Sequence, residues 1–363
     1  MIGARRGQVK TLPRRVAARC SAALIGGLLL GLAAASGRSV RDDNRVWLVA
    51  DQRLTIKTAA GSGALALYLS KDWNRPQPTI TRAIVIIHGL ERAARNARTV
   101  AEVGRARSGL DPESVLLIEP RFLDDRDVAA LHLPAETLRW SHAGWEGGED
   151  AHEPAPISSF AALDAILGRL AERTIFPNLK TVVIAGHSGG GQLVQRYAVT
   201  GRGGGALAEA GIHVRYLAAN PSSYVYFSPE RPAADGFAAF NGASCPAFDH
   251  WKYGMTGLPA YSAGADPAEL EAAYIARDVV YLLGTGDDDP DHPMLDKTCM
   301  AEAEGPNRYA RGLAYFRYLQ WRHPTGLAHR LLQAPGVGHD SDGMFNSACG
   351  LTALYDLPGC DGG

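Results

Sequence analysis

Residues 181–192 place a serine between a strand-like segment and a helix-like segment. The β-branched, apolar run Thr181–Ala185 leads into Gly-His-Ser-Gly-Gly (residues 186–190), and a helical pattern follows at once. This order predicts a tight strand-to-helix turn with Ser188 at its apex, where the flanking glycines leave room for strained backbone angles. The serine hydroxyl would stand exposed above a sheet. The N–H of Gly189 would lie at a helix N-terminus, where it would stabilise an oxyanion.

A carboxylate and a histidine follow along the chain, each shortly after a strand-like run. Val279–Gly284 leads to Asp287, and Arg330–Gln333 leads to His339. In a parallel sheet, the serine, the acid and the histidine would all project from the carboxyl ends of their strands into one crevice. His339 would then take the proton of the serine hydroxyl, and Asp287 would fix the tautomer of the imidazole. The three residues predict a serine nucleophile activated by a base.

The choice of acid has an alternative one residue along the chain. Asp288 could reach the imidazole instead, although Asp287 comes more directly off the strand end. Asp289 and Asp291 are more typical of a solvated acidic loop. A Ca²⁺ site is a further alternative for this acidic cluster, but the spacing lacks the glycine and the distal glutamate of an EF-hand loop.

A second histidine marks the expected oxyanion loop. His88 closes the apolar run 83–87 and precedes Gly89. A His-Gly pair at this place is typical of the loop whose next backbone N–H, here that of Leu90, is the second oxyanion donor beside Gly189. His187 lies inside the serine turn and faces away from the hydroxyl, so we assign it to packing. Apart from His339, the remaining histidines have no strand-end context that favours a role as the base.

Strand-like and helix-like segments alternate along residues 45–363, which predicts an α/β domain with a mostly parallel sheet and helices on both faces. A helix is expected over Ser158–Arg173, where apolar residues recur at helical spacing. Near the start, Leu54–Ala59 and Ala64–Leu69 predict an antiparallel hairpin that joins the sheet. The strand-like runs of the sheet itself are Arg82–Ile87, Ser114–Glu119, Thr181–Ala185, Val214–Ala219, Val279–Gly284 and Arg330–Gln333.

A long aromatic segment at about 221–277 interrupts this alternation. Because loops of that length in a compact domain are usually functional, we expect the segment to be a cap over the crevice, with Cys245 pinning it. A second loop, 140–148, could form another wall. For most of the aromatic residues, packing of the cap onto the body is the better interpretation, because aromatic side chains dominate cores through their area alone.

The chain resembles the α/β-hydrolases, and the resemblance covers nearly everything after the first 40 or so residues. It implies Ser188 as the nucleophile, Asp287 as the acid, His339 as the base, and Leu90 and Gly189 as oxyanion donors. We expect no cofactor and no metal. The chain is similar in particular to exported bacterial and fungal members that carry matching stretches at 220–224, 251–254 and 307–312. The motifs that carry the resemblance are Ile87-His88-Gly89, Gly186-His187-Ser188-Gly189-Gly190, Leu283-Gly284-Thr285-Gly286-Asp287 and Gly338-His339-Asp340.

The N-terminus predicts export. Residues 1–37 hold a basic stretch, then an apolar stretch from Ser21 to Ala35, then small residues suited to cleavage. The apolar stretch is short for a membrane span, which leaves an uncleaved anchor as the alternative and predicts no stable membrane insertion once the signal is removed. Seven of the 37 Lys and Arg residues lie in the first 40 positions, so 30 basic side chains face 38 acidic ones in the rest of the chain. That acidic balance excludes a nucleic-acid partner.

Four cysteines remain after the signal. In an exported chain an even number predicts two disulfides, and proximity favours Cys349–Cys360, which leaves Cys245–Cys299. Four reduced thiols are the alternative. We therefore expect a secreted or periplasmic serine hydrolase acting through an acyl-enzyme on a small-molecule or polymeric carboxylic ester. A serine peptidase and a non-catalytic binding protein on the same fold are the alternatives.

Overall fold

The computed structural model describes residues 52–92 and 94–360, with the side chains of residues 94–96 left aside. The predicted export signal at 1–37 lies outside the described residues and stays a prediction.

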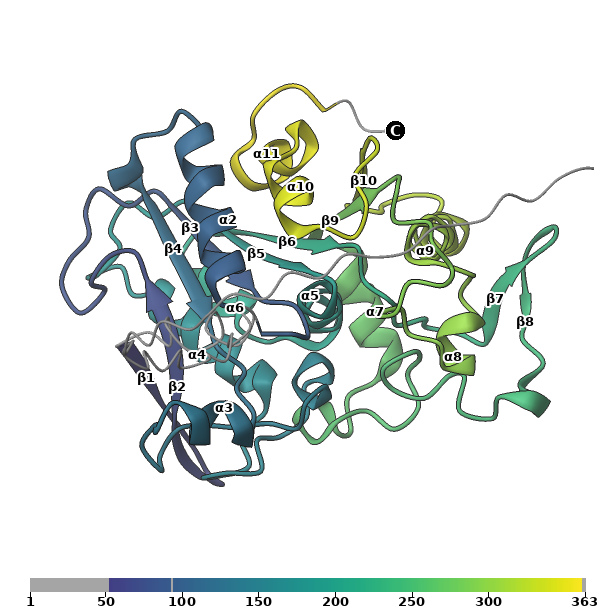
Figure 1. Cartoon of the computed structure of the whole chain (residues 1–363), viewed down its shortest axis with the longest axis horizontal. Coiled ribbons are helices and arrows are strands. Elements are labelled where there is room, and N and C mark those ends of the chain that lie inside the picture. The colour runs from purple at the N-terminus through teal and green to yellow at the C-terminus, as the bar shows by residue number, and fades with distance from the viewer. Residues whose placement is uncertain (1–51, 93, 361–363) are drawn as a thin grey trace, which may run out of the picture. The chain divides into compact units, whose positions relative to one another are not determined.

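One eight-stranded sheet organises the domain (Figure 1), in the spatial order β1-β2-β4-β3-β5-β6-β9-β10. β1 and β2 form the predicted antiparallel hairpin, and β2 pairs antiparallel with β4, whereas every pairing from β4 to β10 is parallel. A separate hairpin consists of β7 and β8. The strands are β1 (Gln52–Thr58), β2 (Gly61–Leu69), β3 (Arg82–Ile87), β4 (Val115–Pro120), β5 (Thr181–His187), β6 (His213–Ala219), β7 (Glu230–Ala233), β8 (Gly236–Ala239), β9 (Asp278–Gly284) and β10 (Arg330–Ala334).

The central strands are apolar on both sides because both sides of the sheet are covered. In β3, Val85 and Ile87 belong to one buried cluster with residues of α4, α5 and α9, whereas Ile84 and Ile86 belong to a second cluster with residues of α2, α10 and α11. Such double burial is typical of parallel sheets, whose strands are continuous apolar runs. The predicted mostly parallel sheet with helices on both faces is confirmed.

Helices follow most strands, as the alternation predicts. The α-helices are α2 (Ala94–Arg107), α3 (Asp125–Ala130), α4 (Ser159–Leu170), α5 (Gly189–Thr200), α6 (Gly204–Glu209), α7 (Pro267–Ile275), α8 (Cys299–Glu302), α9 (Arg308–Arg322), α10 (Ser341–Asn346) and α11 (Ala348–Tyr355). Short 3₁₀ turns are η1 (Pro112–Ser114), η2 (Gly144–Gly147), η3 (Gly242–Ser244) and η4 (Ala260–Ser262). The helix predicted over Ser158–Arg173 is α4, and the Ser158 hydroxyl caps it by accepting the N–H of Phe160.

Segment 221–277 holds the β7–β8 hairpin and α7, and its first aromatic residues pack into the body of the domain. Tyr224 and Tyr226 are completely buried in the cluster that contains α5 and α9. The interpretation of these aromatics as packing residues therefore fits, and the role of the segment as a cap stays a prediction.

Both disulfides join the cysteine pairs expected from the sequence. Cys245 is bonded to Cys299, which ties segment 221–277 to the start of α8, and Cys349 is bonded to Cys360 after α11. The two bonds exclude the alternative of four reduced thiols in this structure.

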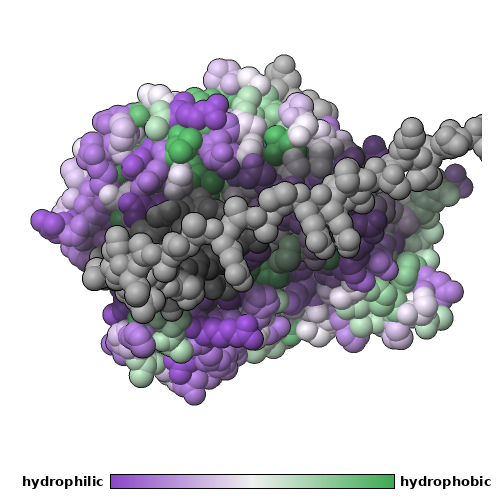
Figure 2. All heavy atoms as spheres, viewed as in Figure 1, coloured by the Kyte–Doolittle hydropathy of each residue, from purple (hydrophilic) through white to green (hydrophobic). Residues whose placement is uncertain are grey.

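Among the helices that the structure describes, none combines the length and apolar composition needed to cross a membrane. Figure 2 shows hydrophilic and hydrophobic residues interspersed over the coloured part of one face.

Candidate active site

The turn after β5 holds Ser188 in a conformation that only a tightly packed neighbourhood sustains. Ser188 has φ 58° and ψ −121°, between the strand and α5. A β-carbon on Gly186 would lie 2.3 Å from the backbone of Gly190, and one on Gly190 would lie 2.5 Å from the carbonyl oxygen of Ile87. The glycines of the pentapeptide are thus required by the close approach of the turn, α5 and β3, and this approach fixes where the serine hydroxyl points.

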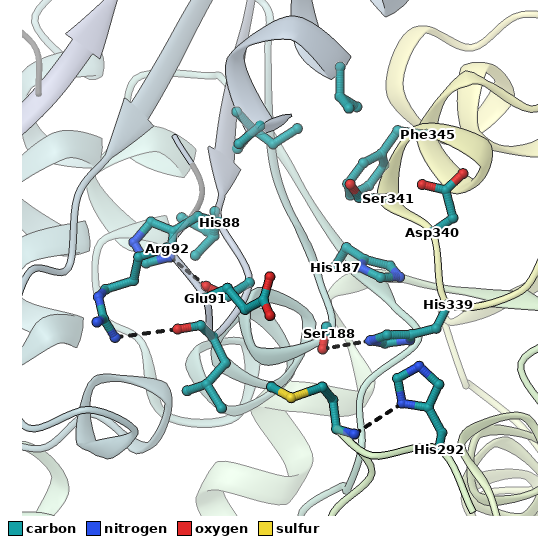
Figure 3. Close-up of a pocket in the computed structure, with 17 residues that line it drawn as sticks. His88, Glu91, Arg92, His187, Ser188, His292, His339, Asp340, Ser341 and Phe345 are labelled. Atoms are coloured by element: carbon teal, nitrogen blue, oxygen red, sulfur yellow. Dashed lines mark hydrogen bonds between the residues drawn. The ribbon is translucent and has the colours of Figure 1, made fainter. Parts of the chain in front are cut away.

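Three side chains from separate loops meet at this turn. The Nε2 atom of His339 lies 2.9 Å from Oγ of Ser188, and its Nδ1 atom lies 2.7 Å from Oδ2 of Asp287. A carboxylate only accepts, so Nδ1 carries the proton and Nε2 is free to accept the serine hydroxyl. Figure 3 shows His339 beside Ser188 with the bond between them. The structure thus brings together the three residues named from the sequence, with distances suited to proton transfer.

The structure places the carboxylates of the two candidate acids in different surroundings. Asp287 is 3% exposed and contacts the imidazole, whereas Asp288 is exposed and the structure gives it no bond to His339. Asp289 and Asp291 are also exposed, as expected of a solvated loop.

Arg308, at the start of α9, contacts the oxygen of the buried Asp287 carboxylate that His339 does not contact. Its Nη1 atom lies 3.3 Å from Oδ1 of Asp287, its Nε donates to the hydroxyl of Ser222 at 2.8 Å, and its Nη2 donates to the carbonyl of Met294 at 2.5 Å. The Arg308 side chain is fully buried. Burial lowers the pKa of Arg308, and the charge of Asp287 opposes that shift. The sequence analysis did not find Arg308 as a site residue, because no spacing rule connects the first turn of α9 to a loop 21 positions earlier.

The two expected oxyanion donors lie side by side. A β-carbon on Gly189 would lie 3.1 Å from the backbone nitrogen of Leu90, so the two backbones are in close contact at the turn. Among the described residues, neither N–H has a hydrogen-bond acceptor. Both amides are therefore available for a negatively charged oxygen.

His88 fixes the peptide that presents the Leu90 amide. Its Nε2 atom accepts the N–H of Phe122 at 3.1 Å, so the proton is on Nδ1 and donates to the carbonyl of Gly89 at 2.8 Å. Burial, and after it the charge of Arg121, lowers the pKa of His88 well below its usual range and keeps the ring neutral. Because a trans peptide directs its C=O and N–H to opposite sides, holding the Gly89 carbonyl also sets the direction of the Leu90 N–H.

Arg92 fixes the other end of the same loop. Its guanidinium makes ion pairs of 2.6 Å with both Asp124 and Asp127 and donates to the carbonyl of Leu90 at 3.3 Å. The residue has φ 54°, a left-handed conformation that an arginine rarely adopts. The oxyanion loop is therefore held by side chains that are themselves fixed.

A pocket of about 310 Å³ opens beside Ser188 and His339. Apolar residues from β3, α2 and α10 line one part of it, namely Ile86, Ile87, Ala97, Val100 and Phe345. Figure 3 shows the rest of the wall, with Glu91 and Arg92 on one side of Ser188 and His339 on the other. None of the described lining residues falls in 221–277, whereas His292 and Met294 come from the loop after β9.

Two further histidine rings flank His339. The ring of His187 lies 4.5 Å away and that of His292 lies 5.0 Å away, measured between ring centroids. Burial lowers the pKa of His187 well below its usual range, and the charges of His339 and Arg308 add to this shift. Burial also lowers the pKa of His292. His187 also lines the pocket, and the lowered pKa values favour the neutral form of both rings beside His339.

Comparisons with known proteins identify the architecture. No model of a protein family matches the sequence, and no curated protein sequence matches it. Among solved structures, the chain is similar to poly(aspartic acid) hydrolase-1 from Sphingomonas sp. KT-1, with 21% identity, a TM-score of 0.55, and coverage of 84% of this chain and 98% of the other. It is equally similar to LpqC, described as a poly(3-hydroxybutyrate) depolymerase, from Bordetella parapertussis, with 21% identity, a TM-score of 0.55, and coverage of 85% and 92%. Likeness at this level of identity shows a shared fold.

Proposed function

We propose that this chain, which has the α/β-hydrolase fold, is an exported serine hydrolase that cleaves carboxylic esters through an acyl-enzyme. The observation that carries the proposal is the hydrogen-bond chain from Oγ of Ser188 through His339 to Asp287, at the mouth of a pocket. An isolated serine hydroxyl is a poor nucleophile, and a correctly oriented imidazole is what activates it.

In the acylation step, Nε2 of His339 takes the hydroxyl proton while Oγ of Ser188 forms a bond to the ester carbonyl carbon. The carbonyl oxygen becomes an oxyanion that the N–H groups of Leu90 and Gly189 stabilise, each by about 3 kcal/mol in the transition state. The C–O bond to the alcohol then breaks, and His339 gives its proton to the leaving oxygen. The carboxylate of Asp287 stabilises the imidazolium between these two transfers.

The deacylation step repeats the same sequence with water. His339 takes a proton from a water molecule, the hydroxide oxygen attacks the acyl carbon, and the second tetrahedral intermediate uses the same two amides. The acid product leaves when the bond to Oγ breaks and the proton returns to Ser188. Atoms and charge balance with one ester and one water consumed.

The pocket supports an ester with an apolar part, because Ile86, Val100 and Phe345 line it. A small-molecule ester fits this volume, and an end of a polymeric ester would also reach Ser188. The two similar structures are a poly(aspartic acid) hydrolase and a poly(3-hydroxybutyrate) depolymerase, so the proposal keeps polymeric as well as small substrates.

The export part of the proposal rests on residues 1–37 of the sequence and is supported by the two disulfides, because such bonds persist in oxidising compartments. We therefore propose a secreted or periplasmic location.

Two activity measurements test the proposal against its alternatives. The protein should react with a fluorophosphonate probe and hydrolyse p-nitrophenyl esters but not aminoacyl anilides. Hydrolysis of the anilides at comparable rates would instead support a serine peptidase. Absence of both labelling and hydrolysis would support a non-catalytic protein on the same fold.

Replacing Arg308 tests whether the buried cation positions the acid. Arg308→Met leaves the carboxylate of Asp287 buried without its ion partner, so we expect a loss of about 3–5 kcal/mol in the free energy of unfolding. Displacement of the carboxylate should also lower kcat, by up to about 100-fold. Arg308→Lys keeps the charge and should restore part of both losses. Denaturant unfolding and ester hydrolysis measure the two effects.

Arg311→Met is the matched control. Arg311 lies on the same helix, is fully buried, and donates to the carbonyls of Gly305, Ser222 and Asp296 without contacting Asp287. The Arg311→Met variant should have a lower free energy of unfolding than the wild type. It should nevertheless retain a larger share of the wild-type kcat per folded molecule than Arg308→Met does. Equal kcat losses in the two variants would mean that Arg308 has no specific effect on Asp287.

A further inference from the structure

A buried carboxylate that the proposed mechanism does not use lies against the oxyanion donors. Glu146 belongs to η2 and is 5% exposed. Its Oε1 atom lies 2.6 Å from the position that a β-carbon on Gly189 would take, and the nitrogen of Leu90 lies 3.1 Å from that same position. The carboxylate oxygen of Glu146 therefore lies close to both Gly189 and the amide of Leu90, next to Ser188.

One oxygen of this carboxylate is bonded and the other is not. Oε2 accepts the amide of Gln192 at 3.2 Å and lies 3.7 Å from Nη1 of Arg196. Oε1 accepts no hydrogen bond from any residue that the structure describes. Burial raises the pKa of Glu146, and the charges of Arg196 and Lys252 oppose that rise.

The loop that carries Glu146 is fixed, so its side chain cannot easily turn away. The indole N–H of Trp251 donates to the carbonyl of Gly147 at 2.6 Å, and the ammonium of Lys252 donates to the carbonyl of Ala143 at 2.9 Å. These two hydrogen bonds from segment 221–277 thus hold the 140–148 loop in place beside α5.

When ionised, the carboxylate of Glu146 would repel an oxyanion held by Leu90 and Gly189, and a hydrogen-bond donor on its free oxygen would reduce that repulsion. A donor that reaches Oε1 would lie on the Leu90 side of Ser188, because Oε1 and the Leu90 nitrogen lie around the same position at Gly189. The leaving alcohol must face His339 to receive its proton, whereas Glu91 and Arg92, which follow Leu90, lie on the opposite side of Ser188 (Figure 3).

We propose that Glu146 determines substrate specificity by accepting, through Oε1, a hydrogen bond from a hydroxyl or N–H on the acyl chain of the substrate. This inference rests on the proposed ester hydrolase function. A site that offers an acceptor to a substrate donor rejects the analogue lacking the donor, because the buried carboxylate is then left unpaired. The substrates would be esters of hydroxy or amino acids in preference to esters of simple fatty acids.

The test compares p-nitrophenyl 3-hydroxybutyrate with p-nitrophenyl butyrate, two esters that differ in one hydroxyl. We expect the wild type to prefer the hydroxy ester in kcat/KM by about tenfold or more, and Glu146→Gln to lose most of that ratio, because an amide is a weaker acceptor than a carboxylate. p-Nitrophenyl 3-aminobutyrate as a third substrate separates an N–H donor from a hydroxyl donor. Glu149→Gln, at an exposed carboxylate directly after the 140–148 loop, is the control and should keep the wild-type ratio.

The outcomes separate this inference from the proposed function. If the wild type hydrolyses the butyrate ester but favours neither donor-bearing ester, or if a folded Glu146→Gln keeps the wild-type ratio, the role of Glu146 is overturned while the hydrolase stands. If the wild type cleaves none of the esters, the proposed function itself fails. Thermal unfolding of Glu146→Gln verifies that the variant is folded.

Discussion

Ser188→Ala should abolish ester hydrolysis, lowering kcat by about 10⁶-fold, because the acyl-enzyme cannot form without Oγ. The remaining site would still hold substrate near the amides of Leu90 and Gly189, so a residual rate above that in water is expected. Removing one oxygen from a partly exposed position leaves the packing of the turn unchanged. The thermal midpoint should therefore stay close to that of the wild type. Hydrolysis of p-nitrophenyl butyrate measures the loss.

Labelling with a fluorophosphonate is an independent test of the Ser188→Ala variant. Because the fluorophosphonate forms its bond to the serine oxygen, Ser188→Ala should no longer be labelled. Labelling that survives in this variant would identify a different nucleophile, and hydrolysis at more than a few percent of the wild-type rate would do the same.

Asp287→Asn should lower kcat by about 10⁴-fold. In the native site the carboxylate accepts the Nδ1 proton of His339 at 2.7 Å, which leaves Nε2 free for the serine hydroxyl. An asparagine can offer its NH₂ group to the imidazole instead, which favours the tautomer with the proton on Nε2 and removes the base. The shape of the side chain is almost unchanged, so the loss reports on tautomer and charge. Steady-state kinetics on a p-nitrophenyl ester measures it.

Asp288→Asn is the matched control one residue along the chain. Its carboxylate is exposed and the structure gives it no bond to His339, so we expect a change in kcat of less than about twofold. The opposite pattern, a mild effect at Asp287 and a severe one at Asp288, would reassign the acid and require the loop after β9 to rearrange.

Local patterns predicted the elements that carry the candidate site. The apolar run ending in glycine predicted β5, the turn and α5, because a buried strand and a tight turn each constrain the residue types of a few adjacent positions. The alternation of segments predicted the parallel sheet. From the sheet it followed that side chains after β5, β9 and β10 share one edge.

Contacts between distant segments were beyond local reasoning. In the sequence, Arg308 resembles any charged residue of a helix, and Glu146 resembles any charged residue of a loop. Their burial beside Asp287 and Gly189 depends on how α9 and the 140–148 loop pack onto the sheet. The pocket wall is a second example, since β3, α2, α10 and the loop after β9, which are far apart in the sequence, build it together.

The sequence by itself determined the order of strands and helices, the serine turn, the expected acid and base, and the favoured pairing of the cysteines. Each of these depends on residue type and spacing over short distances, or on the shared direction of parallel strands. Only the tertiary structure placed Asp287 rather than Asp288 against His339, placed Arg308 against Asp287, and left one oxygen of Glu146 unbonded beside Gly189 and Leu90. The reason is physical: the cost of burying a charge depends on what surrounds it in space, and that environment exists only once the chain is packed.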